Sequence, residues 1–324
     1  MDPHDAPRTR LLWESAIKRG IPLHQFQIRN NPGGLSFFVA RLGSRARAFE
    51  GLPRPNRGIS KSITWMDNKA ILKKKFTAAG IPMAKGRACR TFPQALTILK
   101  ELGGPLITKP HIGSRSRHSS VHIRTEEQLR HGFDIAKQLS PLVIVEQELQ
   151  GYLFRILLVN EKVAGVIRRE PPFVLGDGIV TIRELIEAEN KNPKRQGPTF
   201  HMLRMDEDVK KELERQNRSL DSIPKKDEII FLSTHISRFY GGSTSNVTNR
   251  VHPDNIKLFE HIGETLGDSL VGVDFIIGDM ELSWKVQSLC GVIECNSLPN
   301  IDLHHDVLYG ENFDAAGYLL DLVL

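Results

Sequence analysis

Three side chains that carry oxygen ligands interrupt apolar runs near the end of the sequence. Asp274 breaks one run, and Glu294 and Asn296 break the next. Because side chains alternate along a strand, Glu294 and Asn296 are expected on one face and Cys295 on the other. A buried carboxylate is costly unless it is paired or binds a metal, and hard oxygen ligands favour Mg2+. The alternative is that these acids sit at strand ends and pair with surface Lys or Arg.

Two lysines, Lys69 and Lys109, are a second group of residues that could bind a ligand. Lys109 ends an apolar stretch, directly before Pro110 and a turn that contains Gly113. An ammonium at that place could reach a phosphate held by loop amides. A lone lysine there is otherwise a solvated strand end, and the phosphate interpretation gains support only together with the oxygen ligands.

Hydrophobic periodicity and helix start and stop signals predict the elements that carry these residues. Asp67 is expected to cap a helix over 68–79 that ends at Gly80, and Asp254 a helix that ends at Gly267. The remaining elements are helices over 93–102, 125–138, 181–190 and 206–217, and strands over 105–109, 142–146, 154–159, 162–169, 228–233, 270–277 and 291–296. Helices and strands alternate without the regular rhythm of a barrel.

The first 65 residues are predicted to form a small separate unit. It would contain a helix over 9–18, a strand over 24–28, a Gly33-Gly34 turn and a strand over 35–42. The stretch 51–58 is rich in Pro, Gly and Arg and is typical of a linker. The predicted domains are therefore an N-terminal α/β unit, 1–65, and a larger domain, 66–324.

Composition limits the class of protein. A chain of 324 residues with 40% hydrophobic and 25% charged residues has enough apolar surface for a core and is typical of a globular protein of about two domains. No apolar run approaches the ~20 residues of a membrane span. The start, MDPHDAPRTR, lacks the pattern of a signal peptide, and three cysteines are too few for a disulfide framework. We expect a cytoplasmic protein with no membrane partner.

A net charge of +6 allows anionic partners. The basic residues are dispersed and aromatic residues total only 7%, so no nucleic-acid-binding face is indicated.

Nine short motifs follow one another along the chain. They are Asp67-Asn-Lys69 with Ala79-Gly-Ile-Pro82, Ile107-Thr-Lys-Pro110, Val145-Glu-Gln-Glu-Leu-Gln-Gly151, Arg168-Arg-Glu-Pro171, Gly176-Asp-Gly178, Gly241-Gly-Ser243, Gly272-Val-Asp-Phe275 and Glu294-Cys-Asn296. In this order they resemble the ATP-grasp superfamily over roughly residues 65–324. The sequence of segments 176–185, 220–224 and 251–255 is most similar to the ATP-grasp domain of cyanophycin synthetases and bifunctional glutathione synthetases. D-alanine:D-alanine ligases are more distant in sequence.

The resemblance implies an α/β fold in which two α+β lobes grip ATP. It implies that Lys69 and Lys109 bind phosphates and that Gly113 and Ser114 are the first residues of a phosphate-binding loop. The remaining nucleotide contacts that it implies are backbone groups of an adenine hinge, at Glu146, Gln147 and Leu149.

The same resemblance implies the metal and catalytic residues. Asp274, Glu294 and Asn296 would hold one or two Mg2+ ions, with Mn2+ as an alternative. Positive charge and backbone amides would bind the transferred phosphoryl group and the oxyanion that follows, from Arg155, Arg238, Gly241 and Gly242.

Some positions depart from the family pattern. The phosphate loop 113–120 contains one glycine, whereas relatives are usually glycine-rich there. Leu153 stands where relatives commonly place an acid on the ribose. Phe239 and Tyr240 lengthen the loop before Gly241, and Gly272 stands where some D-alanine:D-alanine-type ligases carry an arginine. Either Ser and Arg side chains of the loop supply the donors that loop amides normally provide, or the loop closes poorly and ATP turnover is slow. Leu153 cannot accept a hydrogen bond from ribose.

The function that the resemblance implies is an ADP-forming ligase. It would join the free carboxylate of an amino acid or peptide to an amine through an acyl phosphate. The alternatives are a nucleotide-binding regulatory protein that has lost catalysis, a kinase with the same grip, and a nucleic-acid-binding protein. The sequence does not identify the substrates, and it does not determine whether the protein is a homodimer.

Two further sets of neighbouring residues, one of arginines and one of histidines, have no assigned role. Arg168 and Arg169 could contact phosphate or an acidic substrate, although adjacent strand residues face opposite sides. His304 and His305 are expected to be exposed in a loop.

Overall fold

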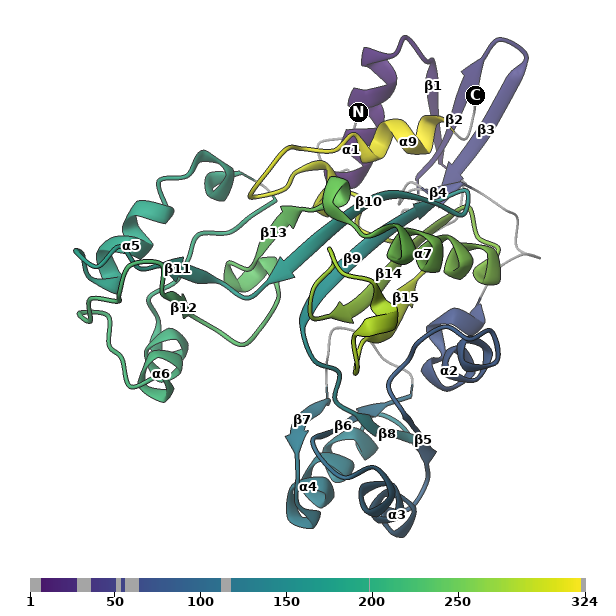
Figure 1. Ribbon diagram of the computed structural model, residues 1–324. Helices are drawn as coiled ribbons and strands as arrows, with labels where there is room; N and C mark the ends of the chain where they lie inside the picture. The colour runs from purple at the N-terminus through teal and green to yellow at the C-terminus, as the bar shows by residue number, and fades with distance from the viewer. Residues whose placement is uncertain are drawn as a thin grey trace. The chain divides into compact units, whose positions relative to one another are not determined.

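The chain folds into helices and antiparallel sheets (Figure 1), and the computed structural model describes residues 7–27, 36–50, 54–55, 64–111, 118–197 and 199–321. It divides into two compact units built from separated segments. Unit 1 comprises Met1–Asn56, Ala164–Asn249 and Asn300–Leu324, and unit 2 comprises Arg57–Val163 and Arg250–Pro299. This division differs from the predicted 1–65 and 66–324, because the first segment groups with the last.

Unit 1 begins with a helix and a four-stranded antiparallel sheet. The elements are α1 (Pro7–Lys18), β1 (Leu23–Gln27), β2 (Ser36–Leu42), β3 (Arg45–Glu50) and β4 (Arg54–Pro55), with the strands in that order. The short strand β4 lies inside the stretch predicted as a linker. The rest of that stretch, and the predicted Gly33-Gly34 turn, lie outside the described residues.

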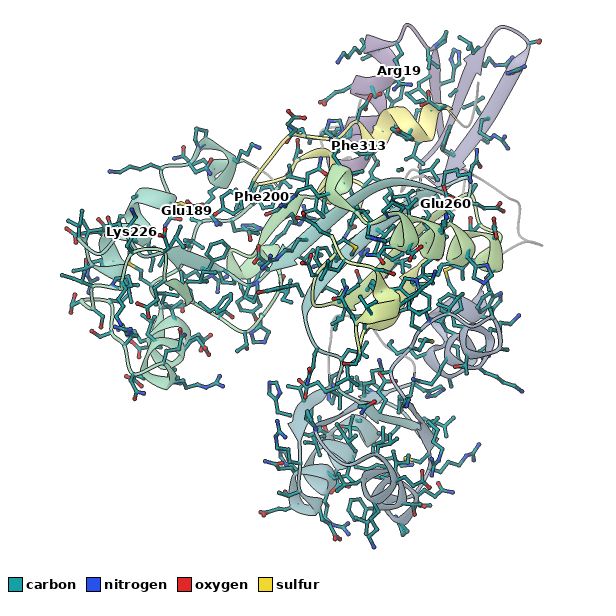
Figure 2. All side chains as sticks on the ribbon, viewed as in Figure 1. Arg19, Glu189, Phe200, Lys226, Glu260 and Phe313 are labelled. Carbon is teal, nitrogen blue, oxygen red and sulfur yellow. The ribbon has the colours of Figure 1, made fainter. Side chains whose placement is uncertain are left out.

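Helix α1 joins the C-terminal part of unit 1. Arg19, labelled in Figure 2, donates from Nη2 to Asp314 at 3.0 Å and from Nη1 to Asp321 at 2.6 Å, at the end of α9 (Ala315–Asp321). Gly317 of α9 permits this approach, since a Cβ there would stand 2.0 Å from Arg19 Nη2.

The rest of unit 1 contains two short antiparallel pairs. Strand β10 (Lys162–Glu170), which starts just before the unit boundary, pairs with β13 (Ser243–Asn246), and β11 (Phe173–Leu175) pairs with β12 (Ile229–Phe231). Helices α5 (Ile182–Glu189) and α6 (Glu207–Arg215) share a core with β11 and β12. The remaining elements are η3 (Pro193–Gln196), η4 (Arg238–Tyr240), η5 (Thr248–Arg250, at the unit boundary) and α8 (Asp302–His305).

Unit 2 contains a four-stranded antiparallel sheet with helices on one face (Figure 1). The strands are β5 (Gly86–Cys89), β8 (Val143–Gln147), β6 (Leu106–Pro110) and β7 (Ser120–Ile123), in that order across the sheet. Helices α3 (Phe92–Leu102) and α4 (Glu126–Lys137) bury Ile98, Leu129 and Phe133 against it. Both helices begin with the capping box that Thr91 and Thr125 form with a glutamine three residues on.

Unit 2 also holds the strands with the predicted metal ligands. Strands β9 (Tyr152–Val159), β14 (Leu270–Ile277) and β15 (Gly291–Asn296) pair antiparallel, with β14 in the middle. Helix α7 (Pro253–Leu266) packs Phe259 edge-on against Phe275 of β14. The other elements are η2 (Thr64–Asp67), α2 (Lys69–Ala78) and η6 (Trp284–Val286).

Two predicted helix caps are wrong by one or two residues. Asn68, not Asp67, caps α2, because its Oδ1 accepts from the amides of Ala70 and Ile71. His252, not Asp254, caps α7, because its Nδ1 accepts from the amide of Asp254. The predicted ends at Gly80 and Gly267 are confirmed, and both glycines have positive φ.

All three cysteines are buried, and none of them forms a disulfide. Within the described ranges, no helix combines the length and the apolar character needed to cross a membrane.

Candidate active site

Three charged residues form a row across adjacent strands of unit 2. Asp274 of β14 lies opposite Arg155 of β9 on one side and opposite Glu294 of β15 on the other. The next pair on the same face of β14 and β15 is Gly272 and Asn296, two residues away. Because residues two apart share a face of a sheet, the three predicted oxygen ligands lie on one face.

Arg155 and Asp274 form a buried bidentate pair. The guanidinium donates from Nη2 to Oδ2 at 2.8 Å and from Nε to Oδ1, and the side chains are 10% and 8% exposed. Burial alone would lower the pKa of Arg155, but the Asp274 carboxylate raises it above its ordinary value. Gly272 leaves room for this guanidinium, since a Cβ there would stand 3.0 Å from Arg155 Nη1.

Glu294 has a different environment from Asp274. Burial and the neighbouring Asp274 charge raise its pKa, while Lys69, Arg155 and Lys109 act against that rise. Two carboxylates that oppose each other across a strand pair destabilise one another unless a cation lies between them.

The residues present fit a hard divalent cation. The donor set is two carboxylates and one amide, and a cation would relieve the electrostatic repulsion between Asp274 and Glu294. Asn296 buries its Nδ2 with no partner among the described residues, and rotation of the amide would place Oδ1 there. In the described part of the chain, no three His, Cys, Asp or Glu residues are grouped so that they could hold a metal ion, so Asn296 is needed to complete a set of three.

Lys109 is not the solvated strand end that a lone lysine suggests. Its Nζ lies 2.6 Å from Oε1 of Glu146, and its side chain is 12% exposed. Lys73 of α2 lies 2.7 Å from Oε2 of the same carboxylate. Burial raises the pKa of Glu146, but the two ammonium groups more than offset this and lower it. Lys69, the other predicted phosphate ligand, is the first residue of α2.

The predicted adenine hinge lies at the end of β8. Glu146 is flanked in register by Gly86 and Ile107, and the amide of Gln147 donates to Lys85 O at 2.7 Å. Leu149 follows in the connection to β9. Gly113 and Ser114 lie outside the described residues.

The residues of unit 1 that are predicted to bind the oxyanion form hydrogen bonds with other protein atoms. Arg238 donates to Asp302 at 2.6 Å and to Thr199 O at 3.4 Å. The amide of Gly241 donates to Arg238 O at 2.9 Å, and that of Gly242 donates to Ser237 O at 3.0 Å. Both amides therefore donate within their own turn, and their binding of the phosphoryl group and the oxyanion stays a prediction.

Sequence reasoning missed the residue that supports this turn. Arg195, whose side chain is fully buried, donates to Gly241 O at 3.0 Å and to Glu189 at 2.8 Å. Glu189, labelled in Figure 2, also accepts from the Tyr309 hydroxyl at 2.9 Å. Arg195 belongs to a charged stretch that is typical of an exposed loop, so no signal in the sequence marks it.

Lys73 was also missed, although a signal exists. It lies four residues after Lys69, so the two lysines share a face of α2.

The residues without an assigned role are placed as follows. Arg168 pairs with Glu170 at 2.6 Å, and Arg169 donates to Ile236 O at 3.0 Å. The expectation that His304 is exposed in a loop is wrong, because it lies in α8 and is 1% exposed. His305, in the same helix, is half-buried.

Comparison with known proteins gives relatives over almost the whole chain. The cyanophycin synthetase of Trichormus variabilis is 29% identical over 98% of this chain and 35% of its own length. The glutathione biosynthesis bifunctional protein GshAB of Clostridium perfringens is 26% identical over 97% of this chain and 40% of its own. The chain thus spans about a third of the cyanophycin synthetase and two fifths of the glutathione protein. No family model matches the sequence.

A solved structure supports the fold. The bifunctional glutathione synthetase from Pasteurella multocida superposes with a TM-score of 0.76 at 22% identity, over 98% of this chain and 44% of that one. The resemblance found in the sequence motifs is therefore confirmed, and the chain has the α/β ATP-grasp fold and is similar to a part of the cyanophycin and bifunctional glutathione synthetases.

Proposed function

We propose that the chain is an ATP-dependent carboxylate–amine ligase. The observation that carries the proposal is the row of Arg155, Asp274 and Glu294 with Asn296 beside it, on one face of three strands. Asp274, Glu294 and Asn296 would hold Mg2+, which neutralises phosphate charge when bound. The similarity to two kinds of synthetase supports the same class of reaction.

The proposed reaction needs no nucleophilic side chain. A substrate carboxylate oxygen attacks the γ-phosphorus of ATP, so that the bond from that phosphorus to the β,γ-bridging oxygen breaks and ADP leaves. A neutral amine then attacks the acyl phosphate carbon, phosphate leaves, and the amine loses a proton. The protein positions the reactants and stabilises negative charge. The substrates are an amino acid or peptide with a free carboxylate, and an amine.

A second function has specific support. Arg155 is held by Asp274, Lys109 by Glu146, and both glycine amides by their own turn, while Leu153 cannot accept a bond from ribose. These observations favour a nucleotide-binding regulatory protein with little turnover.

The test is release of ADP and phosphate from Mg-ATP across a panel of amino acids and short peptides, with mass spectrometry of the products. The control is the double variant Asp274→Ala, Glu294→Ala. Turnover that needs both a carboxylate and an amine, and that disappears in the control, would establish the ligase. Binding of Mg-ATP without turnover would favour the regulatory function, and no binding of ATP would contradict both.

A further inference from the structure

One buried carboxylate of unit 2 is shared by two lysines. Glu146 is 3% exposed, and its two oxygens lie 2.6 Å from Lys109 Nζ and 2.7 Å from Lys73 Nζ. The lysine side chains are themselves only 13% and 12% exposed. The cluster therefore carries two positive charges and one negative charge in a largely dry environment.

Three elements build this cluster, and a glycine makes room for it. Lys73 comes from α2, Lys109 from β6 and Glu146 from the central strand β8. Lys73 Nζ also donates to the carbonyl of Ala84, which fixes the ammonium between α2 and the start of β5. Opposite Glu146, a Cβ on Gly86 would stand 2.5 Å from the Glu146 Cβ.

The second lysine is more than a carboxylate in this position needs. A single well-placed ammonium already compensates a buried carboxylate, and a second one adds its own desolvation penalty. Part of this positive charge acts on Glu294, whose pKa Lys109 lowers, and a nucleotide phosphate would be a second anion for one of the two lysines. Lys109, on the strand that leads to the predicted phosphate loop, is that lysine.

We propose that Lys73 is a positioning residue that holds Glu146 neutralised when Lys109 leaves it for a nucleotide phosphate. This inference rests on the proposed function, because it requires ATP to bind. Without Lys73, the movement of Lys109 would leave the buried Glu146 carboxylate charged and without a cation, which is strongly unfavourable. Lys109 would then stay on Glu146, and the phosphates would lose a ligand.

The experiment compares ATP with adenosine by isothermal titration calorimetry in the full chain. Lys73→Met should weaken ATP binding about tenfold, or ~1.4 kcal/mol, which is an ordinary coupling for residues of one network. Adenosine binding should not change, since adenosine has no phosphate to draw Lys109 away. Lys73→Arg should retain ATP binding, because it keeps the charge.

A double variant separates positioning from simple structural support. Adding Glu146→Gln to Lys73→Met should restore ATP affinity, because no carboxylate then holds Lys109. The matched control is Lys74→Met, an exposed neighbour on the same helix that loses the same charge. Thermal unfolding of each variant checks that it is folded.

The outcomes separate this inference from the proposed function. If the wild-type chain binds ATP and Lys73→Met binds it equally well, the inference is overturned and the ligase proposal stands. Equal weakening of ATP and adenosine, or no rescue by Glu146→Gln, would also overturn it and assign Lys73 to structure alone. If the wild-type chain binds no ATP, both proposals fail together.

Discussion

Glu146 and Asp274 are both buried carboxylates, but they meet their cations in different ways. Asp274 accepts two hydrogen bonds from one planar guanidinium that is always charged. Glu146 is shared by two ammonium groups on flexible stems. The bidentate pair fixes the orientation of Asp274, whereas Glu146 can keep one partner while the other moves.

We expect Arg155→Met to lower the free energy of unfolding by about 3–5 kcal/mol, since it removes the bidentate guanidinium from the buried, charged Asp274 carboxylate. Urea denaturation followed by circular dichroism measures the change. The matched control is Arg183→Met, whose pair with Asp221 is 45% and 78% exposed, and which should change stability by less than about 1 kcal/mol. Equal effects of the two substitutions would contradict the assigned role of burial.

The Glu146 cluster should give stability a dependence on acid pH. The folded pKa of Glu146 lies below the ordinary 4.5, so the charged carboxylate contributes stability that is fully present above pH 4.5 and is lost as pH falls through the folded pKa. Glu146→Gln should cost about 3 kcal/mol near neutral pH. The difference from wild type should shrink on acidification below pH 4.5, measured by urea unfolding at each pH. A difference that stays constant down to full protonation of the acids would show that the charge of Glu146 contributes nothing.

The sequence predicted which residues of the site are chemically unusual, but not which side chains pair. Asp274 and Glu294 stood out because they interrupt apolar runs. That Arg155 faces Asp274, and that Lys73 reaches Glu146, depends on strand register and on the packing of α2 against the sheet, which no single segment encodes.

At the scale of elements, β8 is the strand on which the Glu146 cluster depends. It lies between β5 and β6, and its neighbour β5 approaches so closely at Gly86 that a Cβ there would stand 2.3 Å from Val145 O. Gly86 also has a φ of +148°, which other residues rarely adopt.

Gly86→Ala should therefore separate β5 from β8 and destabilise the chain by more than about 2 kcal/mol. Gly80→Ala is the matched control, because Gly80 has a φ of +72° but nothing within 4 Å of a Cβ; it should cost only about 1 kcal/mol, the strain of the backbone. Thermal denaturation compares the two. Similar losses would mean that backbone strain, not the approach of β8, explains the glycine.

Element prediction succeeded where local signals suffice. Strands β14 and β15 have the predicted bounds, since turn residues flank an apolar run on each side. Six strands were not predicted, namely β3, β4, β5, β7, β11 and β13, and all of them except the six-residue β3 are two to four residues long. Such short strands owe their conformation to their partners rather than to their own sequence.

At the scale of the whole molecule, the segments of each unit are far apart in the sequence. The predicted boundary near residue 65 followed a change in composition, which marks a linker only when few contacts cross it. Helix α1 instead packs on α9 and shares ion pairs with it through Arg19. Contacts between chain segments about 300 residues apart leave no local mark in the sequence.

Loosening α1 should consequently loosen α9. Leu12→Ala removes a side chain of α1 that is fully buried and should cost about 2–5 kcal/mol. Hydrogen exchange should become faster in 315–321 as well as in 7–18. The matched control is Ile17→Ala on the same helix, where Ile17 is 73% exposed and little change is expected. Faster exchange confined to α1 would contradict a shared folding unit.

The interleaving of the two units also bears on how the chain folds as it is made. Helix α1 emerges from the ribosome roughly 300 residues before its partner α9, which is about 15–60 s earlier at usual rates of synthesis. Unit 2 is delayed in the same way, because β14 and β15 follow β9 by more than a hundred residues. Unit 1 therefore cannot close until α9 has emerged, nor unit 2 until β15 has emerged, and the apolar face of α1 lacks its native partner over that interval.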